Sequence, residues 1–119
     1  MKSKVLPKVL IVEDMKSFHR LWNLMLHSKI ELLSAISIDE AEKSFADNPD
    51  VAAIAMDGCV PGRHINTLPL VRKMRETFKG PMIAIASDYD HRKELMQAGC
   101  DYEVDKNSLP EKLIEVLRL

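Results

Sequence analysis

The chain has 119 residues and a mass of 13.5 kDa, which is enough for one globular domain and too little for most multidomain enzymes. Its 46% hydrophobic and 29% charged residues are typical of a chain that folds around a core, and they exclude the disordered and fibrous classes. The formal net charge of -1 excludes a chain-wide basic field of the kind that attracts nucleic acid or an anionic membrane surface.

Short continuous apolar runs alternate along the chain with segments of helical periodicity, and such runs are typical of strands buried on both faces of a parallel sheet. The predicted elements, in chain order, are a strand over 9–12, a helix carrying Phe18, Leu21, Trp22 and Met25, a strand over 32–36, a helix carrying Ala41 and Phe45, a strand over 51–56, a helix carrying Val71, Met74 and Phe78, a strand over 82–86, a helix over 89–98, a strand over 102–104 and a helix over 108–118. Strict alternation of strand and helix favours right-handed crossovers and a sheet covered on both sides. We therefore predict one α/β domain over residues 1–119, a flavodoxin-like doubly wound (βα)5 fold with five parallel strands in the order 2-1-3-4-5.

Residues typical of helix ends support these boundaries. Asp39 is predicted to cap the start of the second helix, and Gly99 is predicted to end the fourth. Ser108, followed by Pro110, is predicted to open the last helix.

The cysteines and the N-terminal region indicate the compartment. Cys59 and Cys100 are too few for a disulfide framework, and the four histidines show no metal-ligand spacing. The apolar run 9–12 is too short for a signal peptide or a membrane span. We therefore expect a cytoplasmic protein with reduced thiols, without membrane contact and without direct nucleic-acid contact.

Polar side chains follow the predicted strands at the point where each strand ends. Glu13 and Asp14 follow the first strand, Asp57 the third, Ser87 the fourth and Lys106 the fifth. Because the carboxyl ends of parallel strands meet at one edge of a sheet, these side chains are expected to converge. Three nearby carboxylates repel one another unless their pKa values rise or a hard cation neutralises them, and carboxylate oxygens suit Mg²⁺. The sequence therefore predicts a magnesium site at this edge.

Four motifs in order resemble those of response regulator receiver domains, and the resemblance covers residues 8–119. The segment 9–14, VLIVED, resembles the opening strand of that family with its acidic pair. The segment 56–62, MDGCVPG, resembles the end of the strand that carries the phosphoacceptor aspartate. Ser87 stands where the family has Ser or Thr, and Lys106 stands where it has a lysine after the fifth strand. One such motif is weak evidence, but four at successive strand ends are specific.

The resemblance implies the phosphoacceptor receiver domain of a two-component phosphorelay. Asp57 would take a phosphoryl group from a sensor histidine kinase or a histidine phosphotransfer protein and form an acyl phosphate. Asp14, Asp57 and the backbone carbonyl of Cys59 would bind Mg²⁺ directly. Glu13 would act on the same ion through water.

The resemblance also implies how the phosphorylated state is read. Lys106 would pair with one phosphoryl oxygen, and the Ser87 hydroxyl would bind another and draw its loop inward. The surface of the fourth helix, fifth strand and fifth helix would then switch and act on a downstream target or output domain, and a homodimer formed on phosphorylation is one further partner. Such a domain catalyses only its own phosphorylation and dephosphorylation, so it is not expected to be a turnover enzyme.

Several positions depart from the family pattern. Glu103 stands three residues before Lys106, where many members have the Tyr or Phe that rotates on activation. Tyr102 precedes it and is expected to point to the opposite face of its strand. Asp88 adds a fourth carboxylate, and Tyr89 is expected to shield the phosphoryl group. Asp88 and Glu103 are the best support for an alternative function, a phosphorylation-independent pseudo-receiver that acts as an interaction or dimerisation module.

Two further alternatives fit the sequence less well. A phosphoaspartate hydrolase of the haloacid-dehalogenase type usually carries a second acid two residues after its nucleophile, where this chain has Cys59. A flavin-binding protein of the same fold needs a phosphate loop rich in glycine and hydroxyl groups after its first strand. The segment 13–16 would instead repel a phosphate unless a metal intervened.

Overall fold

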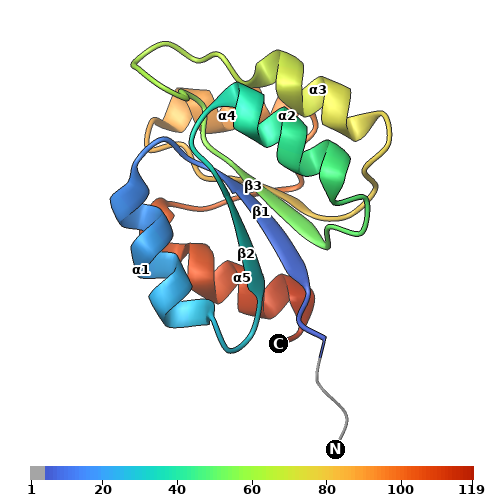
Figure 1. Cartoon of the computed structure of the whole chain (residues 1–119). Helices are drawn as coiled ribbons and strands as arrows, with labels where there is room; N and C mark the ends of the chain where they lie inside the picture. Colours follow the sequence, from blue (N-terminus) through green and yellow to red (C-terminus); the bar gives the residue numbers. More distant parts are fainter. Residues whose placement is uncertain (1–4) are drawn as a thin grey trace, which may run out of the picture.

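The computed structural model describes residues 5–119, which form a sheet of five parallel strands in the order β2-β1-β3-β4-β5 (Figure 1). This order confirms the predicted doubly wound flavodoxin-like fold. The elements are β1 (Lys8–Val12), α1 (Lys16–Leu26), β2 (Glu31–Ala35), α2 (Ile38–Asp47), β3 (Ala53–Met56), α3 (Leu68–Arg75), β4 (Met82–Ala84), α4 (Tyr89–Ala98), β5 (Tyr102–Glu103), a short 3-10 helix (Lys106–Ser108) and α5 (Leu109–Leu117).

Helices cover both faces of the sheet. α1 and α5 pack on one face, whereas α2, α3 and α4 pack on the other (Figure 1). Side chains alternate along β1, so Leu10 and Val12 join the core under α2, α3 and α4, while Val9 and Ile11 join the core under α1 and α5. All four are fully buried, which explains why this strand is a continuous apolar run.

The register of the strands aligns their carboxyl ends. Val12 of β1 pairs with Met56 of β3, and Met56 pairs in turn with Ala84 of β4. The ladder continues one step further, because the Asp57 amide donates to the Val12 carbonyl at 2.9 Å. Glu13 and Asp57, which directly follow two neighbouring strands, therefore leave the sheet at the same edge.

Most differences between the predicted and observed elements concern their ends. The third and fourth strands are shorter than the apolar runs that predicted them, and they span Ala53–Met56 and Met82–Ala84. Ile85 and Ala86 remain buried beyond the end of β4. The Ile85 amide still donates to the Met56 carbonyl at 3.0 Å, so the apolar run predicts burial well and the end of the strand less well.

The predicted cap of the second helix is wrong by two residues. Ser37 is the N-cap of α2, and its hydroxyl accepts a hydrogen bond from the Glu40 amide at 3.1 Å. Asp39 instead lies in the first turn, where its charge faces the positive end of the helix dipole. Gly99 ends α4 as predicted, with a φ of 144° that favours glycine.

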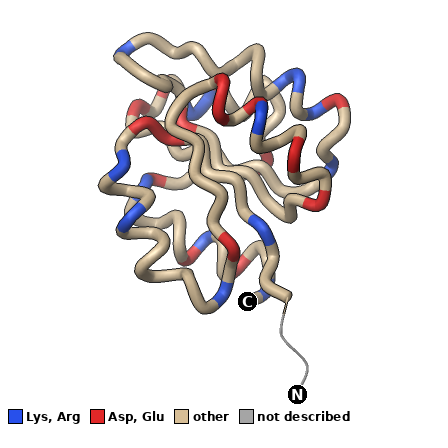
Figure 2. The backbone as a smooth tube through the Cα atoms, viewed as in Figure 1, with Lys and Arg blue, Asp and Glu red and all other residues tan. Residues whose placement is uncertain are grey.

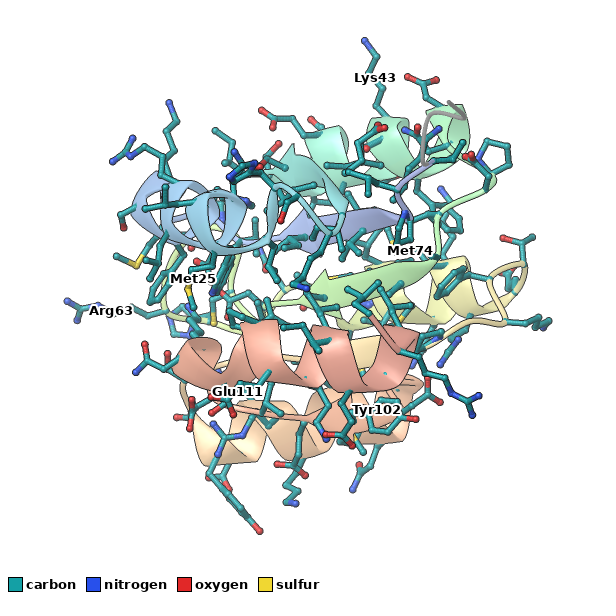
Figure 3. All side chains as sticks on the ribbon, turned by 90° about the horizontal axis from the view of Figure 1, so that it is seen from below. Met25, Lys43, Arg63, Met74, Tyr102 and Glu111 are labelled. Atoms are coloured by element: carbon teal, nitrogen blue, oxygen red, sulfur yellow. The ribbon has the colours of Figure 1, made fainter. Side chains whose placement is uncertain are left out.

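The two residues of β5 face opposite sides, as predicted. Glu103 contacts Arg92 of α4, whereas the Tyr102 ring lies 5.4 Å from the Lys112 ammonium of α5. Figure 3 shows Tyr102 on the side of the molecule formed by α4 and α5. The offset of one residue therefore places an acid, and not an aromatic ring, toward α4.

Charges of both signs are spread over the helices (Figure 2). Within residues 5–119, no helix is both long enough and apolar enough to cross a membrane.

Arg75, the last residue of α3, ties this helix to two loops. Its Nη1 donates to the carbonyl oxygens of Phe78 and Gly80, at 3.0 and 2.7 Å. Its Nε donates to the Gly99 carbonyl at 2.7 Å, and its guanidinium also pairs with Asp101. One half-buried cation thus satisfies three backbone carbonyls around the start of β4 and the end of α4.

Replacing Arg75 is expected to destabilise the fold. Arg75→Ala leaves these carbonyls without their charged donors, so the free energy of unfolding should fall by about 2–3 kcal/mol. Urea denaturation measures this loss. Arg72→Ala, an exposed position on the same helix, should change the free energy of unfolding by no more than about 0.5 kcal/mol. Equal effects of the two substitutions would contradict the bridging role of Arg75.

Candidate functional site

Asp57 lies at the carboxyl end of β3 with only 6% of its surface exposed. Its Oδ1 accepts a hydrogen bond from the Gly58 amide at 2.8 Å. The buried Thr67 hydroxyl contacts the backbone on the other side, 2.8 Å from the Asp57 carbonyl oxygen and 3.2 Å from that of Gly58. Thr67, which the sequence analysis did not identify, thereby joins the start of α3 to the turn that carries Asp57.

Lys106 places a positive charge between the carboxylates of Glu13 and Asp57. Its ammonium lies 2.7 Å from Glu13 Oε1 and 3.5 Å from Asp57 Oδ2. The Lys106 side chain is only 11% exposed, so this charge is mostly withdrawn from water. The start of the 3-10 helix after β5 is therefore attracted to the ends of β1 and β3 by charge.

α1 holds the backbone of Lys106 in place. The Trp22 indole donates to the Lys106 carbonyl at 3.2 Å, and the Lys106 ammonium lies 5.1 Å from the centre of the Phe18 ring. Phe18 and Trp22 are themselves stacked, with ring centres 5.1 Å apart. Two aromatic side chains of one helix thus fix both the backbone and the charge of Lys106.

Glu13, Asp14 and Asp57 form a cluster in which one oxygen of each lies within 4.8 Å of the others. Glu13 is fully buried, and its Oε2 accepts a hydrogen bond from the Met15 amide at 3.1 Å. Its Oε1 forms an ion pair with the Lys106 ammonium at 2.7 Å. Three carboxylates gathered in this way are chemically suited to a hard divalent cation. This cluster could therefore hold a metal ion.

Burial dominates the electrostatics of the cluster. It raises the pKa of Glu13 from 4.5 to about 7, with a further contribution from the charge of Asp57, while Lys106 acts in the opposite direction. Burial also raises the pKa of Asp57, although Lys106 and the Gly58 amide oppose it. Burial alone would lower the pKa of Lys106, but its contacts with Glu13 and Asp57 raise it. The charge state of each of these three side chains therefore affects the pKa values of the other two.

A hollow of about 330 Å³ opens beside Asp57. Four of the five side chains predicted from the strand ends line it, and Glu13 is the exception. The full lining is Asp14, Met15, Asp57, Cys59, Gly62, Arg63, Ala86, Ser87, Asp88, His91 and Lys106. Figure 3 shows the Arg63 side chain pointing outward from the molecule. The fold therefore brings Asp14, Asp57, Cys59, Ser87 and Lys106 to one hollow, while Glu13 lies buried behind Lys106.

Tyr89, next to the hollow, differs from expectation. Tyr89 is absent from this lining among residues 5–119, and its ring lies 4.8 Å from the Lys93 ammonium with 61% of its surface exposed. In this conformation it does not shield Asp57. Cys59 lines the hollow with its thiol 3.6 Å from His91 Nδ1, and burial together with the charge of Asp57 raises the pKa of this thiol.

Asp88 has a structural role that its position in the sequence did not reveal. Its carboxylate caps α4 by accepting hydrogen bonds from the amides of Asp90 and His91, at 2.8 and 3.1 Å. The bond from His91 is the main cause of the lowered pKa of Asp88. The fourth carboxylate is thus present at the hollow and is partly used by the helix.

His19 is a second residue that the sequence analysis did not place at the site. Its Nε2 lies 2.7 Å from the Glu13 carbonyl oxygen, and because a carbonyl only accepts, Nε2 carries the proton. His19, Trp22 and Leu26 form one buried stripe of α1. This stripe was the available signal, since a polar residue on an apolar helix face usually has a specific hydrogen-bond partner.

Comparisons with solved structures find many neighbours among response regulator receiver domains. A two-component response regulator from Clostridium difficile superposes with a TM-score of 0.79 and 19% identity, over 94% of this chain and 96% of that one. A putative response regulator from Chloroflexus aurantiacus gives a TM-score of 0.78 and 23% identity, over 95% of each chain. A response regulator protein from Burkholderia pseudomallei, solved with a phosphorylated aspartic acid, calcium ion and citrate, gives 0.77 and 16%, over 93% of this chain and 66% of that one.

No protein-family model matches the sequence, and no curated protein matches it. The structural neighbours nevertheless cover nearly the whole described chain. The fold is therefore that of the CheY-like receiver domains.

The raised pKa of Glu13 predicts how stability depends on pH. The folded state binds a proton at Glu13 up to about pH 7, whereas the unfolded chain releases it near 4.5. Without divalent ions, the free energy of unfolding should therefore fall as the pH rises through this window. In urea denaturation with EDTA, the wild type should lose more stability between about pH 5 and about pH 8 than Glu13→Gln, which cannot titrate there. Equal pH dependence of the two proteins would contradict the proton at Glu13.

Proposed function

We propose that the chain is a phosphoacceptor receiver domain of a two-component phosphorelay, and that Asp57 receives the phosphoryl group. The observation that carries this proposal is the position of the Asp57 carboxylate. It lies at the end of β3, 3.5 Å from the Lys106 ammonium and clustered with Glu13 and Asp14, and it borders an open hollow. The receiver-like fold supports the same function.

The chemistry assigned to Asp57 is a nucleophilic displacement at phosphorus. A carboxylate oxygen of Asp57 would attack the phosphohistidine of a sensor kinase or a histidine phosphotransfer protein. The new O–P bond forms as the N–P bond breaks, and the imidazole leaves with the bonding electron pair. Lys106 would stabilise the negative charge on the transferring group, because its ammonium is already held beside Asp57.

The donor set fits Mg²⁺. Asp14 and Asp57 would bind the ion directly together with the Cys59 carbonyl, and Glu13 would hold one of its waters. The bound cation supplies the positive charge that lets an anionic donor approach three carboxylates. The cluster of Glu13, Asp14 and Asp57, in which one oxygen of each lies within 4.8 Å of the others, supports this assignment.

Ser87 would connect the chemistry to the surface. It lines the hollow and is exposed, so its hydroxyl is available to a phosphoryl oxygen on Asp57. Movement of Ser87 would shift the loop before α4 and change the face formed by α4, β5 and α5. The partner read by this face would be a downstream target, an output domain or a second copy of the chain. On this proposal the protein catalyses only its own phosphorylation and dephosphorylation, with no turnover of a separate substrate.

One observation favours a second function, a pseudo-receiver that acts without phosphorylation. Glu103 replaces the switching aromatic residue and is held by Arg92 and Lys93 of α4. A surface fixed in this way could serve as a constitutive interaction or dimerisation module. Whether Asp57 accepts a phosphoryl group distinguishes the receiver from the pseudo-receiver.

Incubation with acetyl phosphate and Mg²⁺ tests the main proposal. The intact mass of the wild type should increase by one phosphoryl group, because Asp57 lies in a site suited to both the donor and the cation. The increase should disappear in Asp57→Asn and in the presence of EDTA. A folded wild-type protein that gains no phosphoryl group, either from acetyl phosphate or from phosphohistidine donors, would support the pseudo-receiver.

Asp88 should weaken this reaction through its charge. Asp88→Ser removes the charge while keeping an oxygen that can cap α4, so this variant should phosphorylate faster and bind Mg²⁺ at least as tightly. Asp88→Ala should show the same kinetic effect and, in addition, a loss of about 1 kcal/mol in the free energy of unfolding. Rates measured by intact mass and urea denaturation separate the two effects. Unchanged phosphorylation in both variants would contradict a role for the charge.

A further inference from the structure

Arg92 of α4 connects three parts of the molecule. Its Nη1 donates to the Ala86 carbonyl at 2.9 Å and lies 3.4 Å from the Ser87 carbonyl oxygen. Its Nε donates to Glu103 Oε1 of β5 at 3.3 Å. The guanidinium is therefore bound on one side to the peptides that carry Ser87 and on the other to a neighbouring strand.

Glu103 fixes the direction of this guanidinium. The side chains of Arg92 and Glu103 are 19% and 25% exposed, so the pair is partly withdrawn from solvent. The second oxygen of Glu103 pairs with Lys93, which holds the carboxylate from the other side. Hydrogen bonding by Lys93 also lowers the pKa of Glu103, which keeps it charged. Arg92 thus reaches the two carbonyls with a side chain that is anchored at its far end.

Ser87 itself is free to respond. It is exposed, and within residues 5–119 its hydroxyl makes no hydrogen bond. Its carbonyl and that of Ala86, however, are held by Arg92. Any movement of the chain at 86–87 that draws the Ser87 hydroxyl closer to a phosphoryl group on Asp57 would therefore strain or break these contacts with Arg92.

We propose that Arg92, anchored by Glu103, is a positioning residue that restrains Ser87 and thereby opposes phosphorylation of Asp57. The inference rests on the proposed receiver function and concerns its regulation. Glu103 stands at the position of β5 where many receiver domains have the Tyr or Phe that rotates on activation. The Arg92–Glu103 pair links α4 to β5 at this position. The pair therefore couples the face of α4 and β5 to the loop that carries Ser87, and a partner that engages Arg92 or Glu103 at this face would release the loop.

Substitution of Arg92 distinguishes this restraint from simple electrostatics. Loss of a positive charge near the hollow would weaken the approach of an anionic donor and slow phosphorylation. Loss of the restraint would free Ser87 and accelerate it. The two explanations predict opposite signs for Arg92→Gln, whereas both predict acceleration for Glu103→Gln.

The experiment measures the rate of phosphorylation by acetyl phosphate with Mg²⁺, followed by intact mass. Arg92→Gln and Glu103→Gln should each be about two- to fivefold faster than the wild type, the range expected for a partly exposed ion pair. The double variant should be no faster than the faster of the two single variants, because both substitutions release the same contact. Lys93→Gln is the graded comparison: it loosens Glu103 but leaves the contacts of Arg92 with both carbonyls, so its acceleration should be smaller than that of Arg92→Gln and no more than about a factor of two.

Two further measurements exclude a merely structural role. Arg92→Gln should lower the free energy of unfolding while raising the rate, whereas a structural defect would lower both. In a Ser87→Ala background, Arg92→Gln should no longer accelerate the reaction. Slower or unchanged phosphorylation in Arg92→Gln, or acceleration that persists without the Ser87 hydroxyl, would overturn the inference while leaving Asp57 as phosphoacceptor. A wild type that is never phosphorylated would overturn both proposals.

Discussion

The attraction between Lys106 and two buried carboxylates is the interaction on which the site depends. Glu13 and Asp57 leave neighbouring strands at the same edge, where burial and mutual repulsion oppose their ionisation. The Lys106 ammonium partly offsets both effects, and Lys106 opens the 3-10 helix that follows β5, an edge strand of two residues paired with β4. A weakly bound edge of the sheet is thus tied to its centre by charge, and the hollow keeps its shape because this charge stays in place.

The rest of the site supports this arrangement through backbone contacts. Trp22 binds the Lys106 carbonyl, His19 binds the Glu13 carbonyl and Thr67 binds the Asp57 carbonyl. Each donor comes from a helix or from a residue next to one, while the side chains of Asp57 and Lys106 stay free to line the hollow. A side chain also binds backbone carbonyls in the loop before α4. There Arg92 contacts the carbonyls of Ala86 and Ser87 and leaves the Ser87 hydroxyl free. Helices that look like a covering layer therefore determine the geometry of the strand ends.

The sequence predicted the fold and the convergence of the strand-end residues, because strand burial and parallel topology are both encoded in local hydrophobic patterns. The apolar run 9–12 needs no knowledge of its neighbours to be recognised as a buried strand. The N-cap of α2 was misplaced because Ser37 and Asp39 are both favourable capping residues, and the local backbone decides between them. The contacts of Thr67, Arg75 and Arg92 could not be predicted, since each reaches backbone groups that only the tertiary structure brings near. Glu103 was noted as a departure from the family pattern, but its partners on α4 became evident only in the structure.

The contact between Trp22 and Lys106 has a further consequence. Trp22 is the single tryptophan of the chain, it is almost fully buried, and its indole N–H ends on the carbonyl of the residue that carries the central charge of the site. Indole emission responds to the polarity and hydrogen bonding around the ring, so the intrinsic fluorescence of the protein reports chiefly on this one location. A change in the position of Lys106, whether caused by a cation, an anion or a partner protein, is therefore visible optically without any label. Trp22 is thus an intrinsic fluorescent probe of the position of Lys106.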